Sequence, residues 1–88
     1  MELSLSTRDG FTVAATKGPL DETARDLFRE QLHPLVGVKG TRIIIDMAGS
    51  PRITSPGIGN IVALTADANT NASRVILCRS EEHTSELQ

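Results

Sequence analysis

The six residues Thr41-Arg42-Ile43-Ile44-Ile45-Asp46 decide the fold class. Three consecutive isoleucines leave no alternation of apolar and polar side chains, and such a run is typical of a strand that is covered on both faces. Strands of this kind lie at the centre of parallel sheets. The segment therefore predicts an α/β domain built around a central parallel strand.

Upstream of this strand, the sequence indicates a β-hairpin. Apolar and polar residues alternate over residues 2–6 and again over residues 11–16, which is the period of half-buried strands. Asp9-Gly10 lies between these two segments, and this dipeptide supplies the positive φ angles of a tight turn. We therefore expect two antiparallel strands at the start of the chain.

The spacing of apolar residues between the hairpin and the central strand predicts an amphipathic helix that begins near Asp21. Thr23 and Asp26 have the spacing of a capping box at its start. Pro34 has no N–H to donate, and its ring clashes with the preceding turn of a helix. We expect a kink or an early end of this helix near His33.

A second helix is expected to begin at Ser55-Pro56-Gly57. Ser55 suits the N-cap, and Pro56 suits the first helical position, where its missing N–H costs nothing. The apolar run 74–78 indicates a last strand, so the predicted order is β-β-α-β-α-β in one mixed sheet. The residues expected on one face of the second helix are Ile58, Ile61, Val62, Thr65 and Ala68.

Composition excludes several functional classes. A formal charge of −2, with no Trp or Tyr, offers neither a basic field nor stacking platforms, so nucleic-acid binding is not expected. One cysteine and two histidines cannot form a closed zinc site, and no metal or cofactor is expected. The longest apolar run is far too short to span or insert into a membrane. We expect a soluble protein of a reducing compartment, the cytoplasm.

Polar residues that follow the second and third strands are expected to meet. A right-handed crossover between parallel strands places both carboxyl ends at one edge of the sheet, where sites form in open α/β sheets. The residues that this topology places within reach of one another are Asp21, Asp46, Thr54 and Ser55.

Three motifs in order resemble the STAS domain, the fold of bacterial anti-sigma factor antagonists. They are Gly18-Pro-Leu-Asp21 at the end of a strand, Ile43-Ile-Ile-Asp-Met47, and Ile53-Thr-Ser-Pro-Gly-Ile-Gly59 at the start of a helix. Their spacings match the family across nearly all of residues 1–78. The resemblance implies a STAS-like mixed sheet and a non-enzymatic protein that switches partners: the dephosphorylated domain binds an anti-sigma factor, which is usually also a serine kinase.

The resemblance also assigns roles to individual residues. The phosphorylated serine of the family falls on Ser55, and Asp21 matches the acid beside it. The partner-binding residues then include Gly57, Ile58 and Gly59. Thr54 stands where the family usually has aspartate, and it is the alternative phosphoacceptor. No catalytic residue is expected.

A second functional class stays open at this point. Similar domains serve, without phosphorylation, as cytoplasmic subunits of lipid-transport ABC systems, and Thr54 and Pro56 depart from the motif of the phosphorylated group. An enzyme has little support, because no general base stands out beside Asp21 and Ser55.

The last ten residues, 79–88, carry one apolar residue and no periodicity. They resemble the conceptual translation of a short-read sequencing adapter. We therefore expect a STAS-like domain over residues 1–78 that is incomplete at its C-terminus, followed by a non-native tail.

Overall fold

The computed structural model describes residues 1–79 and has the predicted order β-β-α-β-α-β. One sheet contains four strands in the order β1-β2-β3-β4, in which β1 and β2 are antiparallel and the later neighbours are parallel. Its strands are β1 (Glu2–Arg8), β2 (Phe11–Lys17), β3 (Arg42–Gly49) and β4 (Arg74–Cys78). The predicted tail falls almost wholly on residues 80–88, which lie outside the described residues.

The hairpin turns where the sequence predicts it. Asp9 and Gly10 have φ angles of 55° and 84°, the pair of positive values that a two-residue turn of this kind requires. The register runs without interruption from Glu2 opposite Lys17 to Arg8 opposite Phe11. Asp9-Gly10 therefore sets the register of the first strand pair.

The first helical segment passes through Pro34. It consists of α1 (Ala24–Leu27), a π-helical turn η1 (Phe28–Leu32) and α2 (His33–Val36). Near His33, where a kink or an early end is expected, the helix widens into a π-helical turn, in which the His33 N–H donates to the Phe28 carbonyl five residues back. The expected early end is wrong: a wider turn before the proline relieves the conflict with the i−4 carbonyl, so the helix continues to Val36.

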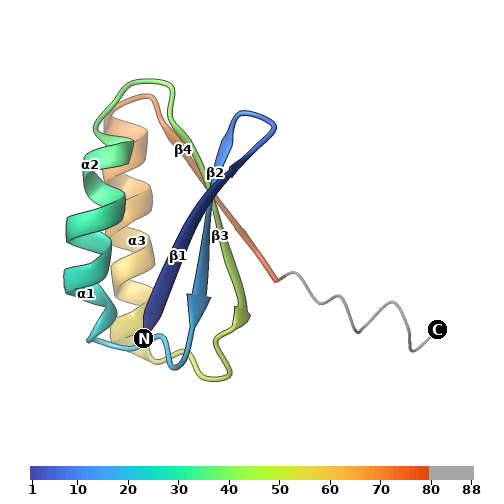
Figure 1. Ribbon diagram of the computed structural model, residues 1–88. Coiled ribbons are helices and arrows are strands. Elements are labelled where there is room, and N and C mark those ends of the chain that lie inside the picture. The colour runs from blue at the N-terminus through green and yellow to red at the C-terminus, as the bar shows by residue number, and fades with distance from the viewer. Residues whose placement is uncertain (80–88) are drawn as a thin grey trace.

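The core lies between these helices, α3 (Ser55–Thr70) and one face of the sheet (Figure 1). Ala14, Ile43 and Ile45 supply fully buried side chains from the sheet. The predicted face of α3 is partly wrong. Val62 and Ile58 are 60% and 52% exposed, because the buried stripe begins at Gly57 and has the spacing i, i+4, i+7 and i+11. Its residues are Gly57, Ile61, Leu64 and Ala68.

Within residues 1–79, helices cover one face of the sheet and leave the other without helical cover. Within the described residues, all helices lie on the same side of the sheet, as Figure 1 shows. Ile43 and Ile45 point toward them and are buried, whereas Ile44 points to the opposite face and is half-buried. The predicted central parallel strand is therefore present, but the predicted cover on both faces is not found within residues 1–79.

No helix within residues 1–79 has both the length and the apolar character needed to cross a membrane.

Candidate functional site

Two loops meet at the carboxyl edge of β2 and β3, as the topology predicts. Leu20 and Ile53 form an isolated parallel bridge between these loops. The Leu20 N–H donates to the Arg52 carbonyl at 2.8 Å, and the Thr54 N–H donates to the Leu20 carbonyl at 3.0 Å. These bonds hold the segment that contains Asp21 against the N-terminus of α3.

Thr54, and not Ser55, caps α3. Thr54 has an extended backbone (φ −98°, ψ 169°), and its hydroxyl accepts a hydrogen bond from the Gly57 N–H at 3.2 Å. Ser55 is already the first helical residue, and its side chain is exposed. The predicted cap is therefore wrong by one residue. The consequence is that the Ser55 hydroxyl has no part in capping the helix.

Gly57 lets the helix approach the neighbouring loop. A Cβ at Gly57 would lie 2.0 Å from the Leu20 carbonyl oxygen, which is far inside van der Waals contact. Asn60 also reaches this loop, where its side-chain amide donates to the Asp21 carbonyl at 3.2 Å. By contrast, a Cβ at Gly59 would meet nothing within 4 Å. Only the first of the two glycines is demanded by the fold.

Asp21 organises the start of the first helix. Its carboxylate accepts hydrogen bonds from the hydroxyl and from the backbone N–H of Thr23, and these bonds hold its pKa below the ordinary value. The stabilisation is therefore present above the ordinary carboxyl pKa and is lost as the pH falls through the lowered value. The predicted capping box with Asp26 is not formed, because the Thr23 side chain makes no cap hydrogen bond.

Asp46 does not join the other predicted site residues. It follows the buried Ile45, so its side chain lies on the face of the sheet opposite the helices. There its carboxylate accepts a hydrogen bond from the Ala48 N–H at 3.1 Å. Burial, and to a smaller extent the charge of Asp46, raises the pKa of the Cys78 thiol. Asp46 thus belongs to another surface.

An exposed stripe on α3 adjoins the first turn. Ser55, Ile58 and Val62 are spaced by three and four residues, so they lie on one side of the helix, and all three are exposed. We call these residues the Ser55 stripe. Val62 is expected on the buried face, because its spacing from Ile58 also fits such a face, but the structure exposes it. The sequence alone offers no signal that separates Val62 from its buried neighbour Ile61.

The family model of the STAS domain matches residues 2–87. The chain belongs to the STAS domain family. No protein with a curated description matched the sequence. The family includes anti-sigma factor antagonists and the STAS domains of transporters. Within the described part of this STAS domain, no three His, Cys, Asp or Glu side chains gather as metal ligands would.

Two alanine substitutions separate the cap of this STAS domain from its exposed serine. Thr54→Ala is expected to lower the free energy of unfolding by about 1 kcal/mol, because it removes the acceptor for the Gly57 N–H. Ser55→Ala is expected to change it by less than about 0.5 kcal/mol, as for an exposed residue without a structural role. Urea unfolding of both variants measures the difference. A larger loss for Ser55→Ala than for Thr54→Ala would contradict the assigned cap.

Proposed function

We propose that this STAS domain is a phosphorylation-controlled binding module that antagonises an anti-sigma factor, with Ser55 as the phosphoacceptor. The observation that carries the proposal is the state of Ser55. Its side chain is exposed, it has no role in the cap, and it lies in line with two exposed apolar side chains, Ile58 and Val62. A kinase can reach such a hydroxyl, and a partner seated on the stripe would cover it.

Phosphorylation at this position would act on binding and leave the fold intact. A phosphate adds about −1.5 to −2 charges at neutral pH. The N-terminus of a helix tolerates negative charge because its dipole is positive there. Burying the same charge against Ile58 and Val62 in an interface is costly, because it must be desolvated without a partner. The dephosphorylated protein is therefore the binding form.

Thr54 is the weaker candidate for the phosphoacceptor. Its hydroxyl already accepts a hydrogen bond from the Gly57 N–H, and its side chain is only partly exposed. Phosphorylation of Thr54 would change the cap of α3, whereas phosphorylation of Ser55 would not. Thr54 also replaces the aspartate that the family usually has immediately before the serine.

Substitution of Ser55 tests the proposal with a cognate anti-sigma serine kinase. Ser55→Ala is expected to bind the kinase as tightly as the wild type but to resist phosphorylation. Ser55→Asp is expected to weaken binding by about tenfold or more, because an unpaired carboxylate is desolvated. Asn69→Asp, which adds the same charge at the far end of α3, is the control and should bind like the wild type. Binding is measured by calorimetry and phosphorylation by mass spectrometry.

Two results would overturn the assignment of Ser55. One is wild-type affinity for Ser55→Asp, and the other is undiminished phosphorylation of Ser55→Ala, which would make Thr54 the acceptor to test. The alternative function, docking on a lipid-transport ABC system without phosphorylation, is favoured by Thr54 at the aspartate position. Binding to such a transporter ATPase, with no phosphorylation by any anti-sigma kinase, would support that alternative.

A further inference from the structure

The sheet face opposite the helices, here called the open face, presents its side chains in three rows. Residues that pair across strands point to the same face, so the register defines each row. The basic row contains Arg8, Phe11, Arg42 and Arg74. The apolar row contains Val13, Ile44 and Ile76, with Ser6 beside Val13 on β1, and the small row contains Ser4, Ala15, Asp46 and Cys78.

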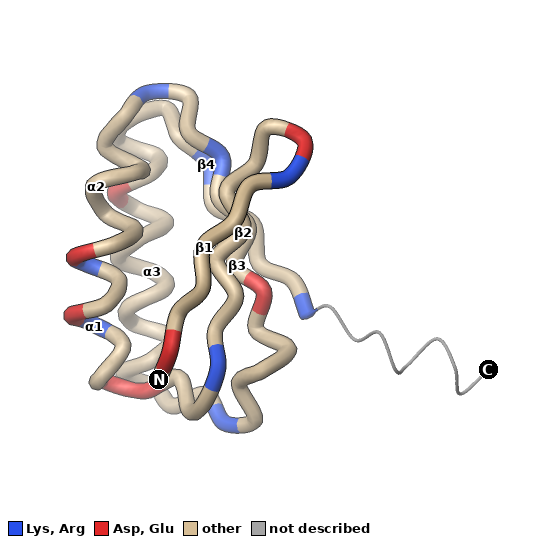
Figure 2. The backbone as a smooth tube through the Cα atoms, in the orientation of Figure 1, with Lys and Arg blue, Asp and Glu red and all other residues tan. Residues whose placement is uncertain are grey.

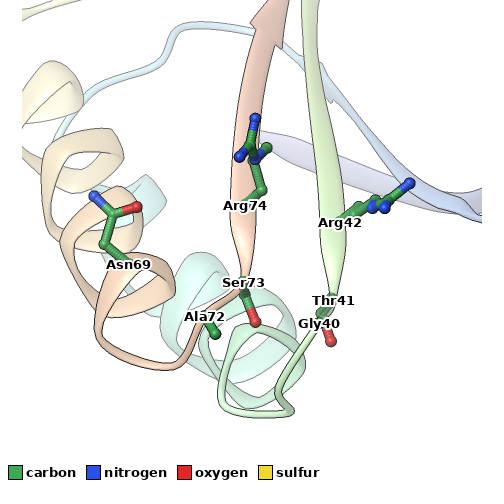
Figure 3. A pocket seen from close by; sticks show the side chains of 7 residues that line it. All are labelled: Gly40, Thr41, Arg42, Asn69, Ala72, Ser73 and Arg74. Carbon is green, nitrogen blue, oxygen red and sulfur yellow. The ribbon is translucent and has the colours of Figure 1, made fainter.

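The basic row concentrates like charges. Arg42 and Arg74 pair directly across β3 and β4, an arrangement that is unfavourable for like charges. Figure 3 shows their side chains projecting from these neighbouring strands, and Figure 2 places basic residues at this end of the sheet. Within residues 1–79, neither guanidinium has an ion-pair partner, although that of Arg42 lies 5.7 Å from the ring centroid of Phe11. An acidic group placed against this row would therefore offset the repulsion between its arginines.

The apolar row leaves apolar side chains exposed to water. Val13 and Ile44 are half-buried, and Ile76 is 39% exposed. The isoleucine run of β3 has the composition of a strand covered on both faces, yet the helices of residues 1–79 cover only one. Burying this row would remove apolar surface from contact with water, and this hydrophobic effect is the main driving force when sheets pack together.

The open face is complementary to itself. On β3, Arg42 and Asp46 lie two residues to either side of Ile44. Consider a two-fold axis that runs between the two sheets, parallel to them, and crosses the strands at right angles at Ile44. Rotation about this axis brings the Arg42 of each copy over the Asp46 of the other. On β2, the same rotation places Phe11 over Ala15, with Val13 at the centre. A bulky, basic row therefore meets a small row that contains an acid.

We propose that the open face is a homodimer interface, in which two copies pack sheet against sheet about a two-fold axis through the apolar row. Packed sheets lie about 10 Å apart with their strands roughly aligned, which suits contact between side chains of both faces. The hollow lined by Phe11, Arg42, Arg74 and Ile76 receives the Asp46 carboxylate of the second copy. A second copy is favoured over an unrelated acidic protein, because this chain itself carries the acid at the matching spacing.

This interface is independent of the proposed function. The Ser55 stripe lies on α3, and α3 packs on the other face of the sheet (Figure 1). A dimer formed through the open face leaves both stripes accessible, so each copy could bind a partner. Failure of the dimer would therefore leave the role of Ser55 untouched, and the reverse also holds.

Charge reversal tests the proposal on the full chain. Light scattering over a concentration series is expected to approach twice the 9.4 kDa mass of one chain. Arg42→Asp places carboxylates opposite carboxylates, and Asp46→Arg places guanidinium groups opposite one another. Each single variant is expected to weaken self-association by about tenfold or more. Arg25→Asp changes the same charge on the exposed surface of α1 and is expected to dimerise like the wild type.

Two combinations of these variants test whether Arg42 pairs specifically with Asp46 of the other copy. The double variant with both Arg42→Asp and Asp46→Arg is expected to recover the dimer, because each pair is reversed and not removed. A mixture of the two single variants is expected to form a heterodimer, since the acidic face of one meets the basic face of the other. A wild-type chain that stays monomeric throughout the series would overturn the proposal. Singles that dimerise like the wild type would overturn the assigned geometry, and circular dichroism checks that every variant is folded.

Discussion

Gly57→Ala is expected to be among the most damaging single substitutions in this protein. A Cβ at this position would lie 2.0 Å from the Leu20 carbonyl oxygen, 2.7 Å from the carbonyl carbon and 3.2 Å from the Asp21 nitrogen. All three are backbone atoms, so no side chain can rotate away, and α3 must separate from the loop. The expected loss is about 3 kcal/mol of unfolding free energy, the upper part of the range for overpacked sites.

Gly59→Ala is the matched control, because it makes the same chemical change on the same helix two residues away. Its Cβ would meet nothing within 4 Å, and the position lies in the interior of α3. Alanine is favoured over glycine in a helix by about 0.8–1 kcal/mol, so this variant should be more stable than the wild type. Urea unfolding of both variants measures the two shifts. Equal effects of the two substitutions would contradict the close approach of α3 to Leu20.

Removal of the Phe28 ring is expected to cost about 3–5 kcal/mol. Phe28 is 1% exposed and has the largest volume of the fully buried side chains among the described residues. It lies at the start of the π-helical turn, where the first helical segment contacts the sheet and α3. Because the stability of a whole domain is about 5–15 kcal/mol, Phe28→Ala should leave a substantial unfolded population.

Phe28→Leu separates loss of the ring from loss of packing. Leucine keeps most of the buried apolar volume, so the expected cost is only about 1–2 kcal/mol. The unfolding free energies of both variants, measured in urea at one temperature, give the comparison. A cost below about 1 kcal/mol for Phe28→Ala would show that the helical segment does not pack on the core as described.

The structure divides the surface of this STAS domain between two sides of the sheet. The Ser55 stripe, which carries the proposed phosphoacceptor, lies on the helical side. The open face, which is the proposed homodimer interface, lies on the other side. Because the two surfaces share no residue, substitutions on one report on that surface alone.

The sequence predicted the strands and their order because their signals are local. Alternation over residues 2–6 and 11–16, a turn residue pair with positive φ, and an isoleucine run each depend on near neighbours only. The edge that brings the Asp21 segment to the start of α3 was also predictable, because the crossover of parallel strands has one hand. The meeting of these two loops was therefore predicted, whereas Asp46 lies on the other face of the sheet and Thr54, not Ser55, caps α3.

The tertiary structure decided what local signals leave open. Thr54 and Ser55 both suit an N-cap, and the bond from the Thr54 N–H to the Leu20 carbonyl holds Thr54 in the extended, capping conformation. Apolar residues on α3 fit more than one face until the sheet buries Ile61 and Leu64 and leaves Val62 in water. Likewise, the isoleucine run predicts cover on both faces of β3, but only the placement of the helices within residues 1–79 reveals which face they leave open. Sequence spacing thus determines which elements form, whereas contacts between distant segments determine which side chains remain free to act.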